Sequence, residues 1–306
     1  MTTGTTGTTG TTGTTGMTVE DRVLAGPHGD LPVRVYTPAG TAVAGLVWAH
    51  GGGFMHGDLD MPEADGVSRA LARSGVVVVS VDYRRVPPID EDPARSGAAA
   101  GPVSSEGIRF PVPSEEVGFA YEWARWADLG VGPDGWSLGG ASAGGNLAAG
   151  ASLRLRDAGT PVRSVLLAYP VAHYVLPAHS AELAAKVEAI GGSFPPELVE
   201  AMNDNYLGHT GGPRSPYAFP GGQDLRGLPP TFVLTSDSDG LRSSGEGYAS
   251  ELAAAGVDVL LVREDGTTHG HLNQPEHPGC ARSLARMAAW LTGAAALVGS
   301  AHEPPR

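Results

Sequence analysis

Ser142 stands in the pentapeptide "GASAG", residues 140–144, which matches the pattern G-x-S-x-G. In this pattern the serine occupies a strained turn between a strand and a helix, which exposes its hydroxyl. The flanking sequence fits, because "GWSLGG" before the serine is strand-like and "AGGNLAAGASLRLRDAG" after it is helix-like. The pattern and its context therefore predict a nucleophilic serine at Ser142.

A serine hydroxyl is a weak nucleophile until a base removes its proton, and the base needs a third group to hold it. Two aspartates, Asp237 and Asp239, end a predicted strand in "TFVLTSDSDGLR". Two histidines, His269 and His271, follow the next predicted strand in "LLVREDGTTHGHLN". Both pairs lie on loops after strands, where the active sites of open α/β sheets form. The sequence thus predicts a Ser-His-Asp arrangement and leaves open which member of each pair takes part.

A second glycine-rich stretch, "AHGGGFMHGD" at residues 49–58, leaves backbone without side chains. Such a loop could approach a phosphate, a metal ion held by His50, His56 and Asp58, or an oxygen that becomes negative during a reaction. The chain has no G-x-x-x-x-G-K-[ST] pattern and no spaced dinucleotide glycines, which argues against a phosphate. One loop also offers few metal ligands. We therefore expect its glycines to donate N–H groups to an oxyanion formed when Ser142 attacks a carbonyl.

Short β-rich runs alternate with helical stretches from about residue 31 onward. The later runs are continuously apolar, which is typical of strands covered on both faces of a mostly parallel sheet. The predicted strands are residues 31–37, 43–49, 76–82, 136–140, 164–169, 231–236 and 257–263. The predicted helices are residues 62–73, 115–129, 143–158, 242–255 and 278–296. This alternation predicts a doubly wound α/β fold.

Three segments do not follow this alternation. Residues 1–16 are a Thr-Thr-Gly repeat that cannot bury enough surface to offset the entropy of ordering, so we expect disorder. Residues 87–110 are rich in Pro, Gly, Ala and Ser and predict a long surface loop. Residues 172–215 hold two helical stretches and no convincing strand, which predicts part of a lid or cap. We expect residues 17–306 to form a single domain.

The composition narrows the classes of partner. The chain has 306 residues, 41% of them hydrophobic, and a formal charge of −13 from 33 acidic and 20 basic residues. No Lys/Arg cluster is present, so we expect neither nucleic acid nor an anionic membrane as a partner. Cys280 is the single cysteine, which excludes an internal disulfide and a Cys-based zinc site and favours a reducing cytoplasm. The apolar run at 75–81 is too short to span a bilayer.

A family resemblance rests on "HGGGFMHGDLD", "VVVVSVDYR", "GGASAGGNLAA", "SDSDGLR" and "TTHGH", which occur in that order. In these motifs the chain resembles the bacterial hormone-sensitive-lipase-like branch of the α/β-hydrolases, over roughly residues 30–295. The resemblance implies an eight-stranded, mostly parallel sheet with helices on both faces. It also implies a small helical cap, partly built from the N-terminal region, so we expect cap elements at about residues 17–30 and 172–215.

The resemblance implies a role for each motif. Ser142 matches the family nucleophile, and His269 matches the base in the family's T-H-G. Asp239 matches the acid, because "DGLR" aligns with the family's D-P-L-[RK] and leaves Asp237 two residues early. The implied oxyanion donors are the N–H groups of Gly52, Gly53 and Ala143. The implied pocket residues are Phe54, Met55 and His56, whereas His50 is expected to brace the loop by packing.

These residues together predict a serine hydrolase, most simply a carboxylesterase that cleaves short- to medium-chain acyl esters through an acyl-enzyme. The expected partner is a small-molecule ester, and the mechanism requires neither a metal nor another cofactor. The same triad could act on a lactone, carbamate, amide or thioester, or transfer the acyl group to an acceptor other than water. A non-catalytic receptor, such as the plant gibberellin receptor that resembles this family, lacks a working triad, whereas Ser, Asp and His are all present here. The resemblance is also compatible with a homodimer.

Overall fold

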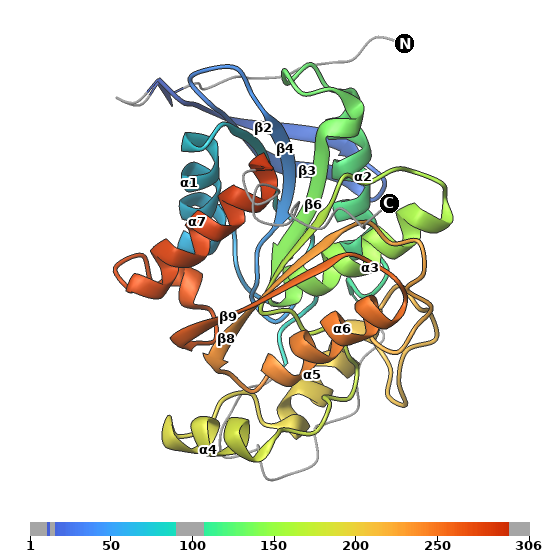
Figure 1. The fold of residues 1–306 in the computed structure, drawn as a ribbon. Helices are drawn as coiled ribbons and strands as arrows, with labels where there is room; N and C mark the ends of the chain where they lie inside the picture. The colour runs from blue at the N-terminus through green and yellow to red at the C-terminus, as the bar shows by residue number, and fades with distance from the viewer. Residues whose placement is uncertain (1–10, 13–15, 90–106, 294–306) are drawn as a thin grey trace, which may run out of the picture.

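The computed structural model describes residues 11–12, 16–89 and 107–293. They form one sheet with helices on both of its faces (Figure 1). The strands are β1 (Thr11–Thr12), β2 (Thr18–Gly26), β3 (Gly29–Thr37), β4 (Ala44–Ala49), β5 (Val76–Val81), β6 (Trp136–Ala141), β7 (Val165–Ala168), β8 (Thr231–Ser238) and β9 (Val259–Thr268). The α-helices are α1 (Val67–Arg73), α2 (Val112–Trp126), α3 (Ala143–Asp157), α4 (Ala181–Ala189), α5 (Pro196–Leu207), α6 (Arg242–Ala254) and α7 (Pro278–Thr292).

The order of strands across the sheet is β1-β2-β3-β5-β4-β6-β7-β8-β9. The pairings from β1 to β5 are antiparallel, and all pairings from β5 to β9 along this order are parallel. Every residue of β4, β5 and β6 is buried, which explains their continuous apolar sequences. Strands β2 to β9 form the eight-stranded, mostly parallel sheet of the α/β fold, so this prediction is confirmed.

Two hydrophobic cores lie on opposite faces of the sheet. Val47 of β4 packs on one face with Tyr121 of α2 and Leu147 of α3. Its neighbour Leu46 packs on the other face with Leu71 of α1, because successive side chains of a strand point to opposite sides. Figure 1 shows α1 and α7 together on one face and α2 and α3 on the other. Within the described ranges, no helix is long and apolar enough to cross a membrane.

Residues 17–30, which we expected to contribute to the cap, lie in the sheet instead. β2 pairs antiparallel with β3 along its whole length and closes at a tight turn where Gly26 faces Gly29. The exposed side chains of β2 include Asp21 and its sequence carries little apolar patterning, so the strand was missed. The strand is held mainly by main-chain hydrogen bonds to β3, and Leu24 is its one fully buried side chain. The prediction of an N-terminal cap element is therefore wrong.

Two other predicted segments are only partly described. Residues 1–10 and 13–15 of the repeat lie outside the described residues, as do residues 90–106 of the long loop. Thr11–Thr12, for which we expected disorder, form β1 by pairing with β2. We expected disorder because these side chains can bury little surface, but main-chain pairing of this kind requires no side-chain burial.

Residues 172–215, here called the cap segment, contain α4 and α5, which match the two predicted helical stretches. In Figure 1 these yellow helices lie together outside the two helical layers. Lys186 of α4 forms an ion pair with Asp237 at the end of β8, with 2.5 Å between Nζ and Oδ1. His179 donates a hydrogen bond of 2.9 Å from Nε2 to the carbonyl oxygen of Gly240. The cap segment therefore packs directly on the loop that follows β8.

Candidate active site

Ser142 occupies the turn between β6 and α3, as the sequence predicted. Its backbone has φ +52° and ψ −119°, a strained conformation for a residue with a side chain. A Cβ on Gly140 would lie 2.3 Å from the carbonyl oxygen of Gly144, and a Cβ on Gly144 would lie 2.2 Å from that of Ala49. Only glycine fits at either place, so the flanking glycines permit the turn that presents the serine hydroxyl.

His269 and Asp239 converge on Ser142 from the loops after β9 and β8. The Ser142 Oγ lies 2.9 Å from His269 Nε2. On the other side of the ring, His269 Nδ1 lies 2.8 Å from Asp239 Oδ2. Asp239 is fully buried, and its Oδ1 accepts a 2.9 Å hydrogen bond from the N–H of Leu241. Three side chains from distant parts of the sequence thus form one continuous hydrogen-bonded chain.

The geometry decides which aspartate and which histidine belong to the triad, a choice that the residues alone left open. Asp237 forms its ion pair with Lys186 and accepts a hydrogen bond from the N–H of Gly266. Burial tends to raise the pKa of Asp237, but Lys186, the N–H of Gly266 and the charge of Arg242 together outweigh burial and hold this pKa below its usual range. The second histidine, His271, is fully buried, with Nδ1 2.9 Å from Ser236 Oγ. Asp237 and His271 therefore have structural partners of their own.

Opposing effects act on the pKa of His269. Burial lowers it, because desolvation disfavours the charged imidazolium, whereas the carboxylates of Asp239 and Glu63 raise it. The carboxylates prevail, so the pKa of His269 lies above the ordinary histidine value of 6.5. The site thus stabilises a proton on this ring when one arrives.

The glycine loop after β4 bends so that its backbone faces the serine. The carbonyl oxygen of Gly52 accepts hydrogen bonds from the N–H groups of Met55 and His56, at 3.1 and 2.8 Å. Gly52 and Gly53 have φ values of +120° and +60°, which side chains disfavour. Ala143 opens α3, where the first N–H groups have no acceptor within the helix. Gly53 and Ala143 line the same pocket as Ser142, and Gly52 directly precedes Gly53.

The histidines that flank the glycines have different surroundings. His50 is fully buried, its Nδ1 lies 2.7 Å from the carbonyl oxygen of Gly51, and its ring stacks on Tyr83 with 4.6 Å between centroids. His56 and Asp58 are exposed. Throughout the part of the chain that the structure describes, no group of three or more His, Cys, Asp or Glu side chains could hold a metal ion. His50 thus braces the loop by packing.

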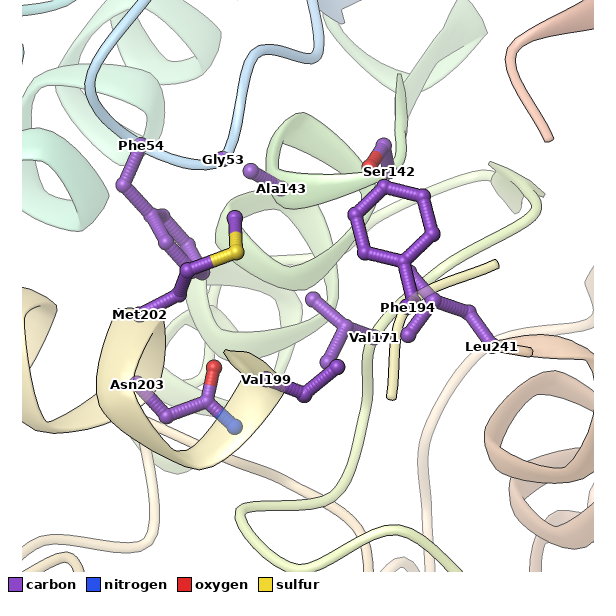
Figure 2. A pocket seen from close by; sticks show the side chains of 10 residues that line it. All are labelled: Gly53, Phe54, Ser142, Ala143, Val171, Phe194, Val199, Met202, Asn203 and Leu241. Atoms are coloured by element: carbon purple, nitrogen blue, oxygen red, sulfur yellow. The ribbon is translucent and has the colours of Figure 1, made fainter. Parts of the chain in front are cut away.

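A small pocket with about 260 Å³ of empty space opens at Ser142 (Figure 2). Phe54 lines it, whereas Met55 and His56, which were also expected there, do not. Met55 is buried, with Sδ 3.2 Å from the N–H nitrogen of Ile89, and His56 points to the surface. The lining residues are Gly53, Phe54, Ser142, Ala143, Val171, Phe194, Val199, Met202, Asn203 and Leu241.

The pocket has two ends, which Figure 2 separates clearly. Phe194 and Leu241 lie at one end, here called the Phe194 end, where the Phe194 and His269 ring centroids are 4.5 Å apart. Phe54, Met202 and Asn203 lie at the other, here called the Met202 end. A Cβ on Gly53 would lie 2.3 Å from the terminal methyl group of Met202, so α5 contacts the glycine loop there. A lid or cap was predicted from residues 172–215, but not that Phe194, Val199, Met202 and Asn203 of this segment line the pocket, because nothing in their types or spacing marks them.

A buried carboxylate that the sequence analysis did not single out lies behind the glycine loop. Glu63 Oε1 accepts a 2.6 Å hydrogen bond from the N–H of Gly51, and Oε2 accepts hydrogen bonds from Tyr169 and Asn273. Burial raises the pKa of Glu63, although these donors favour its charged form. The ring of Tyr169 also lies edge-on to His269, with 5.0 Å between centroids. Glu63 thus links the glycine loop to the surroundings of His269.

Comparisons with known proteins match the part of the chain that holds this site. A family model described as the alpha/beta hydrolase fold matches residues 46–94 and 107–273, which include Ser142, Asp239 and His269. The chain belongs to the alpha/beta hydrolase superfamily. The resemblance to its hormone-sensitive-lipase-like branch is confirmed by the relatives described next.

Among sequences of this superfamily, carboxylesterase NlhH of Mycobacterium tuberculosis is 34% identical over 258 residues, which are 80% of this chain and 72% of that protein. An arylesterase of Saccharolobus solfataricus is 30% identical over 251 residues, covering 80% of this chain and 74% of that protein. The crystal structure of EstE1, a thermostable carboxylesterase cloned from a metagenomic library, superposes with a TM-score of 0.75 at 33% identity. That match covers 90% of this chain and 88% of EstE1.

Proposed function

We propose that this alpha/beta hydrolase is a carboxylesterase that cleaves short- to medium-chain acyl esters through an acyl-enzyme on Ser142. The observation that carries the proposal is the hydrogen-bonded chain from Asp239 through His269 to the Ser142 hydroxyl, which opens into an apolar pocket. Relatives named carboxylesterase and arylesterase, at 34% and 30% identity, support ester hydrolysis. The small size of the pocket favours acyl groups of limited length.

The first half of the reaction acylates the serine. His269 Nε2 accepts the proton of Ser142 Oγ while that oxygen attacks the ester carbonyl carbon. The carbonyl oxygen becomes an oxyanion, and the N–H groups of Gly52, Gly53 and Ala143 are the donors that stabilise it. Asp239 accepts a hydrogen bond from Nδ1 of the imidazolium and stabilises its charge. The bond to the alcohol oxygen then breaks, and the alcohol leaves with the proton from Nε2.

The second half restores the enzyme. A water molecule gives a proton to His269 Nε2 and attacks the acyl carbon, which forms a second oxyanion in the same position. When this intermediate collapses, the bond to Ser142 Oγ breaks and Nε2 returns the proton to that oxygen. The carboxylic acid departs, and every proton transfer has passed through one histidine nitrogen.

Proton transfer to the leaving alcohol also orients the substrate. The alcohol oxygen has to lie near His269 Nε2, so the alcohol occupies the Phe194 end of the pocket, beside the histidine ring. The acyl chain then extends away from His269 into the Met202 end, among Phe54, Val199 and Met202.

The pH dependence of ester hydrolysis tests which histidine is the base. A base must be neutral to accept the serine proton, so activity is present above its pKa and lost below it. Because the pKa of His269 is raised above 6.5, we expect kcat/KM for p-nitrophenyl butyrate to fall as pH decreases, with its midpoint above 6.5. The measurement is a pH-rate profile, corrected for the spontaneous hydrolysis of the ester.

His271 provides the contrasting expectation. Burial, and to a lesser extent the neighbouring His269 and His277, lower the pKa of His271 to about 4. An acid limb near this value, with full activity at pH 6, would show that His271 or a carboxylate acts as the base and would contradict the proposed role of His269.

A further inference from the structure

Asn203 is the one side chain with an amide among the apolar side chains that line the Met202 end of the pocket. It lies on α5 and is 1% exposed. Its neighbours in the lining are Phe54, Val199 and Met202. Figure 2 shows it at the end of the pocket far from Ser142, with its amide oxygen towards Met202. A buried amide in apolar surroundings calls for partners on both its nitrogen and its oxygen.

The nitrogen of this amide has its partner, and that partner fixes the orientation of the group. Asn203 Nδ2 donates a 2.8 Å hydrogen bond to the carbonyl oxygen of Tyr174. A carbonyl oxygen can only accept, so Nδ2 has to face Tyr174 and Oδ1 has to face the opposite way. The Tyr174 hydroxyl donates in turn to Asp204 Oδ1 at 2.6 Å, which holds this part of the cap segment in place. The amide is therefore preorganised.

The oxygen of the amide has no hydrogen-bond partner among residues 11–12, 16–89 and 107–293. Oδ1 is an acceptor with two lone pairs, and it stays accessible from the pocket, because it is not among the fully enclosed unpaired side-chain atoms of the described residues. A ligand atom that enters the Met202 end and carries a hydrogen would satisfy it. The described lining residues include no carboxylate, so nothing there would neutralise an ammonium group. The matching donor is therefore neutral, and a hydroxyl is the simplest neutral donor.

We propose that Asn203 Oδ1 accepts a hydrogen bond from a hydroxyl on the acyl chain, so that the preferred substrates are esters of hydroxylated acids. The inference rests on the proposed ester hydrolysis, which places the acyl chain in the Met202 end. Asn203 determines specificity here and takes no part in bond making. The hydroxyl gains a fixed acceptor, whereas an unsubstituted chain leaves Oδ1 unpaired.

The test compares ethyl esters of butanoic and hexanoic acids with their hydroxylated counterparts, the hydroxyl standing at each position from the second carbon to the chain end. Each kcat/KM, measured by titrating the released acid, is divided by the rate constant for hydroxide-catalysed hydrolysis to remove intrinsic reactivity. At the best hydroxyl position we expect a preference of about tenfold over the unsubstituted ester, the size of one good hydrogen bond. The preference should disappear in Asn203→Leu, which keeps the branched shape and the number of side-chain heavy atoms and removes the amide.

Met202→Leu is the matched control, because it alters a neighbouring apolar side chain and leaves Asn203 in place. We expect the hydroxyl preference to remain in this variant. Equal corrected rates for hydroxylated and unsubstituted esters at every position in the unmodified protein would overturn the inference, even if Asn203→Leu failed to fold. A preference that persists in folded Asn203→Leu would also overturn it. If no ester of either kind is cleaved, the proposed function itself fails, which is a separate result.

Discussion

Replacement of Ser142 by alanine is expected to lower kcat for p-nitrophenyl butyrate by about 10⁶-fold, because the change removes the atom that forms the acyl-enzyme. The oxyanion donors remain in Ser142→Ala, so a residual rate above that of water alone is also expected. The fold should persist. Alanine keeps the Cβ and the strained backbone angles of Ser142, and the one hydrogen bond lost is that to His269 Nε2 at the pocket. Steady-state kinetics and a thermal melt measure the two quantities.

Ser236→Ala is the matched control for this variant. Ser236 also pairs with a histidine, His271, at 2.9 Å, but both residues are fully buried outside the pocket lining. Losing this hydrogen bond should affect stability and change kcat/KM by no more than about tenfold, since neither group reaches substrate. Turnover retained by Ser142→Ala, or an equal loss in Ser236→Ala, would contradict the assignment of the nucleophile.

Replacement of Asp239 by asparagine is expected to lower kcat by about 10⁴-fold. An amide nitrogen placed beside His269 Nδ1 donates a hydrogen, so Nδ1 must accept and the ring proton moves to Nε2. The imidazole then faces Ser142 with its proton rather than its lone pair. The variant also loses a carboxylate that raises the pKa of His269, so any remaining acid limb should move to lower pH.

The variant Asp237→Asn tests which of the two carboxylates near the end of β8 serves His269. Asp237 precedes Asp239 by two residues and forms its ion pair with Lys186 of the cap segment, not with His269. Its replacement should weaken the contact of α4 with this loop and change kcat/KM by less than about tenfold. The comparison uses the same ester at one pH above the acid limb. A larger loss in Asp237→Asn than in Asp239→Asn would reverse the assignment of the acid.

The elements that carry chemistry could be predicted from the sequence because local physical constraints mark them. The turn at Ser142 needs glycine at Gly140 and Gly144, where any Cβ would meet backbone atoms, and that need is visible as G-x-S-x-G. The buried strands β4, β5 and β6 are visible as continuous apolar runs. The residues alone left Asp237 and Asp239 open, and the family resemblance favoured Asp239, which is the aspartate found beside His269.

The features that the sequence did not predict depend on contacts between distant segments. β2 has an exposed and charged surface and is held by its pairing with β3. Glu63 is one acidic residue among 33 in the sequence, and only its buried position under Gly51 distinguishes it. The pocket residues of α5 have the apolar spacing of any packed helix. Asn203 is notable only because the fold places it in the pocket lining, with its amide nitrogen hydrogen-bonded and its oxygen without a partner among the described residues.

The central claim is that Ser142 is the nucleophile activated by His269, and covalent trapping tests it most directly. The protein is treated with a fluorophosphonate, which phosphonylates an activated serine, and the adduct is located by mass spectrometry of the peptides. We predict one adduct per chain, on Ser142, formed faster above the acid limb of His269 than below it and absent from Ser142→Ala. An adduct on another residue, or none on a folded protein, would contradict the account.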